Sequence, residues 1–211
     1  TAVLIAPLRS PALLAKTAAS LDAISNGRLE LGVGLGWQEE EYEASGISFD
    51  QRAKIFWETL DICQSLWKGG PVSHKGEIFE FNDIWCHPTP PQGRDIPLLF
   101  GVKMTESNAQ KIAKIGHGWI PIKTSRDFIS EGSEKLNNAF KEAGRDDKPR
   151  IRGQLPTCVD SNGVPSVDLT LKELEKSMEA GLEEIEVFPI NFAQSPDHLR
   201  EVLELIGELK K

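Results

Sequence analysis

Apolar and polar positions along this chain alternate in blocks that predict buried strands, each followed by an amphipathic helix. Residues 1–6, TAVLIA, form a continuous apolar run that is typical of a strand buried on both faces. Ser10 as N-cap and Pro11 at the first helical position then predict a helix that ends at Gly27. The apolar face of this helix is expected to comprise Leu14, Ala18 and Leu21.

A second strand–helix unit follows, and an irregular stretch comes after it. Residues 29–36, LELGVGLG, predict a strand, and residues 39–68 predict a helix that breaks near Gly46 and restarts with Asp50 as its cap. Residues 69–97 change to Gly, Pro and alternating residues, which predicts a hairpin and an extended connection inserted into the domain.

The strand–helix rhythm then resumes up to the end of the chain. Further strands are predicted at 97–101, 118–122, 150–159 and 183–188. Further helices are predicted at 107–115, 125–143, 170–180 and 196–209. Six strands and six helices result.

Strands that alternate with helices imply one domain over residues 1–211, built on a parallel sheet. Right-handed crossovers lead either to an open doubly wound sheet or to a closed barrel, and the periodicity leaves both open. A barrel needs eight strands and typically about 250 residues. Because the chain starts abruptly inside an apolar run at Thr1, we expect that two further units precede it.

Composition and charge narrow the class of partner. The chain is 39% hydrophobic and 27% charged, as in an ordinary globular protein. Its net charge of −8 disfavours nucleic acid and anionic membranes, which both repel an acidic surface, so we expect a small-molecule partner. Cys63, Cys86 and Cys158 are far apart in the sequence, which predicts neither a metal site nor a disulfide framework and fits a reducing cytoplasm. No run reaches the roughly 20 apolar residues of a membrane span.

The strand over residues 29–36 carries glycines on one face. Period-two alternation separates Leu29, Leu31, Val33 and Leu35 from Glu30, Gly32, Gly34 and Gly36. The glycine face either leaves room for a bulky flat ligand or lets neighbouring side chains pack tightly, and this strand alone favours neither. A dinucleotide-binding fingerprint is disfavoured, because the spacing is G-x-G-x-G and no acidic residue follows a second strand about 20 residues on.

Four motifs occur in order along the first part of the chain: LD-x-x-S-x-G-R, LGVGLGW, the helix ETLDICQSLW, and P-x-P-x-Q ahead of a strand ending in Gly. In this order they resemble the luciferase-like monooxygenase superfamily, particularly its deazaflavin-dependent oxidoreductase branch. The resemblance covers residues 1–122 well, whereas residues 123–211 match mainly by their rhythm. Members are (β/α)8 TIM barrels, so the resemblance implies a barrel of which about strands three to eight are present here.

The resemblance also implies contacts to a cofactor ring. In deazaflavin-dependent relatives a non-proline cis peptide on strand three supports the ring, and that bond falls at Ala2-Val3. Trp37 and Glu40 follow the glycine strand, where relatives place a polar residue that hydrogen-bonds the ring, an amide in some of them. The alternative is that Glu40 and its acidic neighbours form a solvated first helical turn, favoured by the helix dipole.

Residues 101–108 end a strand and open a helix, so their backbone N–H groups face an incoming anion. Lys103, Thr105 and Ser107 add side-chain donors, although Thr105 or Ser107 as a plain helix cap is the alternative. In the family this loop helps to hold the cofactor's phosphate. The resemblance therefore assigns this role to Gly101, Val102, Lys103, Thr105, Ser107 and Asn108.

No catalytic acid or base is named from this sequence. His74, His87, His117 and His198 are scattered without metal-ligand or base–nucleophile spacing, and His117 is expected to be structural. Relatives carry their acid or base near the reacting carbon on strands one or two, which are not in this chain. The catalytic residue is therefore unknown, and no metal is predicted.

The resemblance implies a cytoplasmic oxidoreductase that exchanges hydride between coenzyme F420 or FMN and a small organic substrate. With FMN, activation of oxygen is the second possible reaction, and we favour F420. The alternatives are a non-catalytic flavin-binding barrel subunit and an unrelated TIM-barrel enzyme that acts on a phosphorylated metabolite. The full-length protein is expected to be a homo-oligomer. This segment alone is expected to aggregate or bind cofactor poorly, because its strand edges stay open.

Overall fold

The computed structural model describes residues 1–193 and 195–208, whose contacts divide them into two compact units. Unit 1 comprises residues 1–102 and 115–117, and unit 2 comprises residues 103–114 and the described residues from 118 onward. Both units consist of parallel strands and helices in alternation, so the fold class is α/β, as the sequence predicts. Among the described residues, no helix combines the length and the apolar character that crossing a membrane requires.

Unit 1 contains three parallel strands in the order β1-β2-β5. They span Leu4–Ile5 (β1), Leu31–Gly34 (β2) and Leu98–Gly101 (β5). Val33 lies opposite Leu4 on one side and Phe100 on the other. Because every residue of β2 is buried, this strand forms the centre of the unit's core.

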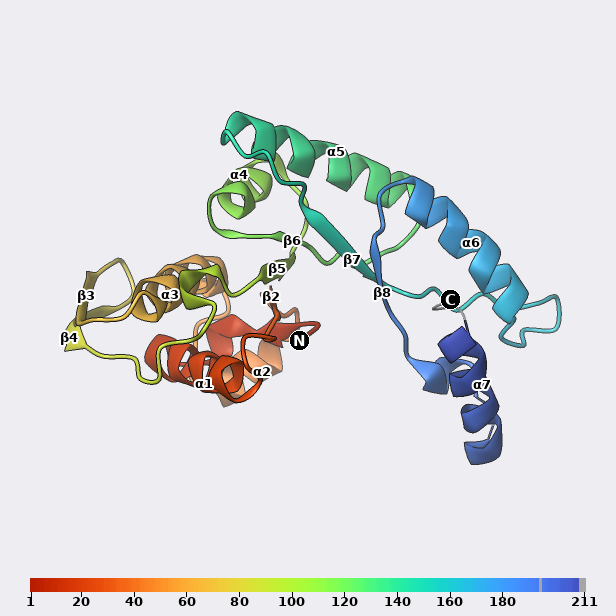
Figure 1. The fold of residues 1–211 in the computed structure, drawn as a ribbon, viewed down its shortest axis with the longest axis horizontal. Coiled ribbons are helices and arrows are strands. Elements are labelled where there is room, and N and C mark those ends of the chain that lie inside the picture. Colours follow the sequence, from red (N-terminus) through yellow and green to blue (C-terminus); the bar gives the residue numbers. More distant parts are fainter. Residues whose placement is uncertain (194, 209–211) are drawn as a thin grey trace. The chain divides into compact units, whose positions relative to one another are not determined.

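The helices of unit 1 are α1 (Pro11–Ile24), α2 (Glu39–Ala44) and α3 (Arg52–Trp67). Helices α1 and α3 lie side by side (Figure 1). The buried Trp67 indole donates a hydrogen bond from Nε1 to the carbonyl oxygen of Ala15, at 3.0 Å. A tryptophan needs such an acceptor when it is buried, so this contact both fills the helix interface and satisfies its polar atom.

The first strand is shorter than its sequence predicts. The ladder of β1 covers two residues rather than residues 1–6. Thr1 nevertheless continues toward β2, because its hydroxyl donates to the Gly32 carbonyl at 2.7 Å and its amino group donates to the Glu30 carbonyl at 2.9 Å. The segment is therefore anchored at both ends, and the ladder is interrupted between them.

Helix boundaries in unit 1 follow the predicted breaks but not every predicted cap. Gly46 adopts a φ of 67° just after α2, which is the left-handed geometry that stops a helix. The N-cap of α3 is Gln51, so the prediction of Asp50 was wrong. On α1, Leu21 is 49% exposed rather than part of the core, because the buried face turns toward Asp22 instead.

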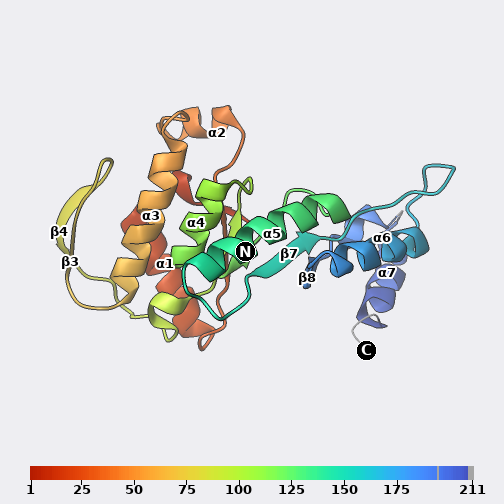
Figure 2. The same cartoon turned by 90° about the horizontal axis from the view of Figure 1, so that it is seen from above.

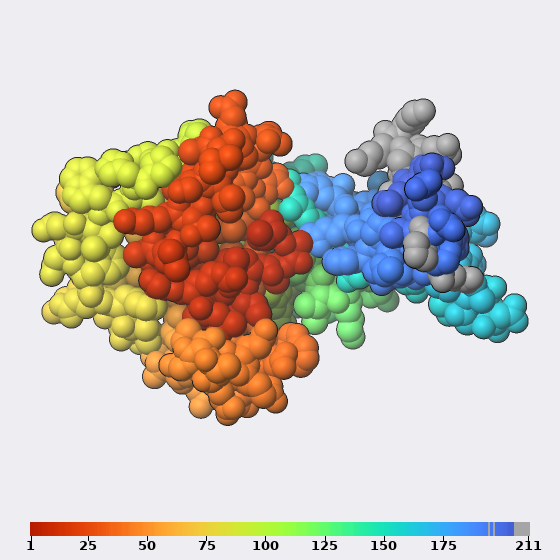
Figure 3. Space-filling view, turned by 90° about the horizontal axis from the view of Figure 1, so that it is seen from below, coloured from red at the N-terminus to blue at the C-terminus, as the bar shows by residue number. Residues whose placement is uncertain are grey.

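The predicted hairpin is present between α3 and β5. Its strands β3 (Val72–Lys75) and β4 (Glu80–Ile84) pair antiparallel. Figure 2 shows the hairpin lying along α3, and Figure 3 shows the hairpin and its following connection, in yellow and yellow-green, beside the red surface of α1. The hairpin is thus an appendage on the helical side of unit 1.

One carboxylate attaches this hairpin to α3. Glu58 accepts hydrogen bonds from the backbone N–H of Phe79 at 2.8 Å and of Ile78 at 3.1 Å, and it contacts His74 Nε2 at 3.1 Å. Burial alone would raise the pKa of Glu58, but these hydrogen bonds outweigh it and hold the pKa below its usual value. A Cβ at Gly76 would lie 2.0 Å from Glu58 Oε1, so only glycine fits there. His74 therefore has a structural role.

Unit 2 contains three parallel strands in the order β6-β7-β8 and four helices (Figure 1). The strands are β6 (Gly118–Trp119), β7 (Arg150–Gln154) and β8 (Glu184–Glu186). The helices are α4 (Glu106–Ile115), α5 (Arg126–Glu142), α6 (Val167–Glu179) and α7 (Pro196–Glu208). The last residue of the predicted final helix, Leu209, lies outside the described residues.

Several boundaries in unit 2 differ from the sequence prediction. Strand β6 ends at Trp119 rather than at residue 122, and β8 ends at Glu186 rather than at residue 188. Strand β7 ends at Gln154 rather than at Val159, because Pro156 cannot donate to a ladder. Helix α6 begins just after Ser166 rather than at Thr170, since the Ser166 hydroxyl accepts a hydrogen bond from the first helical turn.

A close contact between a glycine and a tryptophan seats α5 on the sheet of unit 2. Trp119 is 1% exposed, and a Cβ at Gly132 would lie 2.2 Å from its Cη2 atom. The helix can approach β6 only because this position has no side chain.

Candidate functional site

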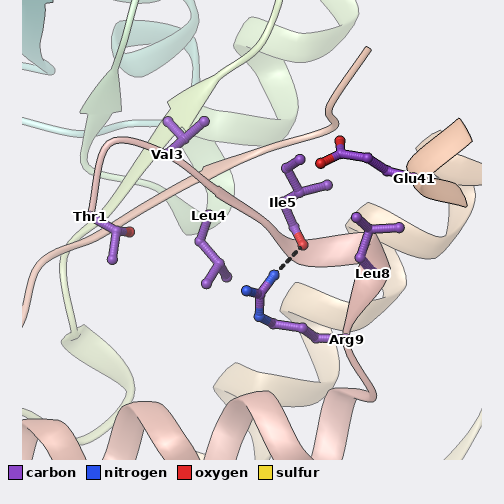
Figure 4. A pocket seen from close by; sticks show the side chains of 7 residues that line it. All are labelled: Thr1, Val3, Leu4, Ile5, Leu8, Arg9 and Glu41. Carbon is purple, nitrogen blue, oxygen red and sulfur yellow. Dashed lines mark hydrogen bonds between the residues drawn. The ribbon is translucent and has the colours of Figure 1, made fainter. Parts of the chain in front are cut away.

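The segment just before β1 carries the bond that the family resemblance implies. The peptide between Ala2 and Val3 is cis although neither residue is proline, which confirms this prediction. Ala2 is exposed and Val3 is 39% exposed, so both are accessible within unit 1. The side chains of Val3 and Leu4 point to opposite sides of the segment (Figure 4).

Two glycines seat the Val3 side chain. A Cβ on Gly34 would lie 2.8 Å from Val3 Cγ2, and a Cβ on Gly101 would lie 2.8 Å from Val3 Cγ1. Both distances are below what real Cβ atoms show, so the two methyl groups occupy the space that these glycines leave. Gly36, at φ 70°, likewise lies against Ile5, because a Cβ on Gly36 would lie 3.0 Å from Ile5 Cγ2.

This packing decides between the two interpretations of the glycine strand at these positions. Gly34 accommodates the side chain of Val3, just before β1, and Gly36 accommodates that of Ile5 in β1. These two glycines therefore provide tight packing, and the Val3 side chain above them remains 39% exposed.

A pocket of about 330 Å³ lies along β1 in unit 1 (Figure 4). Its lining includes Val3, Ile5, Arg9 and Glu41. The Arg9 guanidinium donates to the Ile5 carbonyl oxygen at 3.0 Å, which holds this cation at the pocket wall. The sequence interpretation missed Arg9 and Glu41, because neither falls on a motif or at the carboxyl end of a strand.

Trp37 and Glu40 lie apart from that pocket lining. Trp37 is 84% exposed and Glu40 is exposed in the acidic first turn of α2. This arrangement matches the solvated first turn that the sequence leaves as an alternative. The turn is anchored by Tyr42, whose hydroxyl donates to the Leu35 carbonyl and whose pKa is raised by burial. Of the glutamates in this turn, Glu41 rather than Glu40 reaches the pocket.

The predicted phosphate loop spans residues 101–108. Gly101 and the buried Val102 end unit 1, and the exposed Lys103 begins unit 2. Within unit 2 the Thr105 hydroxyl accepts from the Asn108 N–H at 3.2 Å, so Thr105 caps α4. The Asn108 side chain donates to the Lys103 carbonyl at 2.9 Å, which stiffens the turn.

The first turn of α4 keeps anion-binding groups available. The backbone N–H groups of Glu106 and Ser107 make no hydrogen bond within the described residues, and the Ser107 side chain is exposed. Lys103 and Thr105 line a pocket of about 480 Å³ whose other wall is α5. On that wall Lys135 is paired with Glu131 at 2.5 Å. Free N–H groups at a helix start beside a lysine fit a phosphate group.

Residues of two sequence motifs make a buried clamp in unit 1. Asp22, from LD-x-x-S-x-G-R, is fully buried and accepts hydrogen bonds from the Leu29 N–H at 3.2 Å and the Gln92 N–H at 3.1 Å. Gln92, from P-x-P-x-Q, also donates its amide to Asp22 at 2.7 Å and to the Leu29 carbonyl at 2.9 Å. These motif residues therefore hold the scaffold and touch no pocket described above.

His117 is structural, as expected. The Nδ1 atom of its ring accepts a hydrogen bond from the Leu98 N–H at 3.2 Å, while the backbone N–H of His117 donates to the Leu98 carbonyl at 2.8 Å. The imidazole extends the edge of β5 within unit 1 and is occupied there.

Comparisons with known proteins show which family the chain resembles. The profile of the family described as luciferase-like monooxygenase matches residues 1–164. An uncharacterized protein of Mycobacterium tuberculosis is 37% identical over 152 residues, which cover 72% of this chain and 53% of that protein. The chain spans about half the length of the curated relatives that it matches.

Two solved structures show the same fold at low sequence identity. An F420-dependent secondary alcohol dehydrogenase in complex with an F420-acetone adduct has a TM-score of 0.70 at 20% identity, covering 84% of this chain and 69% of that one. The second structure is the oxygenating constituent of 3,6-diketocamphane monooxygenase from Pseudomonas putida, in complex with FMN. It has a TM-score of 0.62 at 22% identity, and the match covers 75% of this chain and 48% of that one.

Proposed function

Because the chain belongs to the luciferase-like monooxygenase family, we propose that it is an oxidoreductase that works with a deazaflavin or flavin cofactor. One solved neighbour is an F420-dependent dehydrogenase and another is a monooxygenase that holds FMN, so both cofactor classes support the proposal. We favour coenzyme F420, on the order of motifs along residues 1–122. The substrate is a small organic molecule.

The observation that carries this proposal is the seat of Val3. Its two methyl groups rest on Gly34 and Gly101, and the remaining surface of the side chain is open. An apolar residue held from behind in this way offers a firm contact to one face of a flat ring. Any side chain larger than glycine at either seat would displace it.

The start of α4, considered within unit 2 alone, supports a cofactor that carries a phosphate group. Lys103 and the N–H groups of Glu106 and Ser107 would hold its phosphate, and Thr105 and Asn108 would fix the turn that presents them. When bound, the ring supplies hydride transfer, or activation of oxygen if it is FMN, and the protein positions it.

Equilibrium titration of the full-length protein with F420 and, separately, with FMN tests the proposal by absorbance. The expected result is saturable binding of F420. The bound F420 should then be reduced by an alcohol or, in its reduced form, be oxidised by a carbonyl compound. Binding of FMN alone, with oxygen consumption, would replace the dehydrogenase assignment by a monooxygenase. Absence of binding to both cofactors would overturn the proposal.

A conservative truncation tests the seat itself. Val3→Ala removes two methyl groups that a ring would cover, so cofactor affinity is expected to fall roughly 5- to 15-fold. Val164→Ala is the matched control, because Val164 is 40% exposed in unit 2, against 39% for Val3 in unit 1. Equal affinities of the two variants would contradict the role of Val3.

The same proposal includes the architecture and the setting of the whole protein. We propose a closed (β/α)8 barrel that acts as a homo-oligomer in the cytoplasm, in line with the resemblance and the parallel strands. Light scattering of the purified protein measures the oligomeric state, and a monomeric mass would contradict that part.

A further inference from the structure

A second pocket, of about 220 Å³, lies in unit 2 at the carboxyl ends of β6 and β7. Its polar lining comes from Lys123 and Thr124 after β6 and from Gln154 and Thr157 at the end of β7. In parallel α/β folds the carboxyl ends of strands are where ligands bind. Lys123 is the one charged residue of this lining.

Glu186 lies beside this pocket on the next strand. It is the register partner of Gln154, so the two side chains leave the sheet on the same face. The Leu155 N–H donates to the Glu186 carbonyl at 2.8 Å, which fixes this register. Glu186 Oε1 is buried and has no hydrogen-bond partner among the described residues.

Glu184, on the same strand, differs from Glu186 because its carboxylate is fully paired. Glu184 binds the guanidinium of Arg150 at 2.6 Å and that of Arg152 at 2.7 Å, so both of its oxygens are paired. Burial raises the pKa of Glu186, against an opposing effect of Arg152. A buried oxygen without a partner is costly, and a bound polar ligand removes that cost.

The groups around this pocket share one chemistry. The Lys123 ammonium, the Gln154 amide and the two threonine hydroxyls can donate hydrogen bonds, and the Glu186 carboxyl donates one as well in its protonated form. Converging donors around a single cation recognise oxygen acceptors that carry negative charge.

We propose that this pocket, continued by Glu186, is a substrate subsite that binds an anionic oxygen group, either a carboxylate or a phosphate ester. The inference deepens the proposed function, because it names the polar end of the substrate. It can be measured on the protein without any cofactor, so its failure is distinguishable from failure of the proposed function.

Nuclear magnetic resonance titration with inorganic phosphate and, separately, with acetate tests the subsite. Saturable shifts of the backbone amides of Thr124, Gln154 and Thr157 are expected with one probe or both, and the stronger probe identifies the group. Absence of saturable shifts with both probes would overturn the proposal.

Variants assign the response to the named side chains. Lys123→Met and Glu186→Ala are expected to raise the dissociation constant at least fivefold, whereas Glu186→Gln keeps binding because its amide still donates. Lys148→Met, an exposed lysine elsewhere in unit 2, is the control and should change the constant less than twofold. An equal loss in the Lys148 variant, or a fivefold loss in Glu186→Gln, would contradict the assignment.

Competition separates substrate from cofactor. If saturating F420 or FMN leaves the probe's dissociation constant unchanged, the pocket is free for substrate. If either cofactor displaces phosphate from these amides, the subsite belongs to the cofactor and the assignment to substrate is wrong.

Discussion

The buried clamp at Asp22 gives the sharpest test of how this fold is held together. Asp22 is 0% exposed, and its carboxylate accepts three hydrogen bonds, at 3.2, 3.1 and 2.7 Å. Replacing it by alanine would leave the Leu29 N–H and two donors of Gln92, all partly buried, without this acceptor. Each unsatisfied buried donor costs about 1–3 kcal/mol.

These costs overlap, since relaxation and water entry relieve part of them. We therefore expect Asp22→Ala to lower the free energy of unfolding by about 3–5 kcal/mol. Asp22→Asn keeps the shape and one acceptor but turns an NH₂ group toward a donor of Gln92, so its expected cost is about 2–3 kcal/mol. The two variants separate the loss of volume from the loss of the acceptor.

Urea unfolding followed by tryptophan fluorescence measures both changes, because the buried Trp67 indole reports on the α1–α3 packing of the same unit. Asp61→Asn is the matched control, as Asp61 is exposed on α3, and it should change stability by less than about 0.5 kcal/mol. If Asp22→Asn unfolds at the same urea concentration as Asp61→Asn, the clamp is not holding the scaffold.

Further predictions concern the hairpin, the α5 contact and the thiols. The pKa of Glu58 is lowered on folding, so its stabilisation is present above the ordinary glutamate pKa of 4.5 and is lost as the pH falls through the lowered value. The parent should exceed Glu58→Gln in stability by about 1–2 kcal/mol at pH 7, and denaturation curves should converge in acid. Gly132→Ala should cost about 1–3 kcal/mol by overlap with the indole beneath it, while Asn138→Ala on the same helix stays near neutral in melting temperature. Burial raises the pKa of the Cys63 thiol, so a thiol reagent should modify the partly exposed Cys158 first and Cys63 only on unfolding.

The alternation of strands and helices could be predicted from the sequence because it depends on local periodicity. Ser10-Pro11, Gly27 and Gly46 mark boundaries through their backbone preferences, and the structure places helix ends there. The prediction of Leu21 in the core failed for a tertiary reason. Asp22 takes the buried side of α1 because Gln92, 70 residues away, supplies its hydrogen bonds, and no local pattern contains that partner.

The candidate site was likewise predictable from the sequence only in part. The cis bond at Ala2-Val3 is implied by the family resemblance, and Thr105 is one of the two caps that the sequence leaves open for the following helix. The role of the glycine strand could not be predicted, because the same sequence fits both tight packing and space for a ligand. The question is decided by the structure, in which Val3 lies over Gly34 and Ile5 lies over Gly36. These positions depend on how β1 pairs with β2, and that register cannot be read from the sequence.

The motifs that identify the family and the residues that would choose a substrate are different sets. Asp22 is buried in the scaffold and is hydrogen-bonded to Gln92, so a change at either residue costs stability whatever the substrate is. Glu186 lies outside residues 1–164, the range that the family profile matches. It is on β8, which pairs with β7, and β7 ends at the pocket of about 220 Å³. A scaffold that is fixed by buried hydrogen bonds can tolerate exchange of such strand-end residues. Members that share the four motifs are therefore expected to differ in substrate mainly at the positions corresponding to Lys123, Gln154 and Glu186.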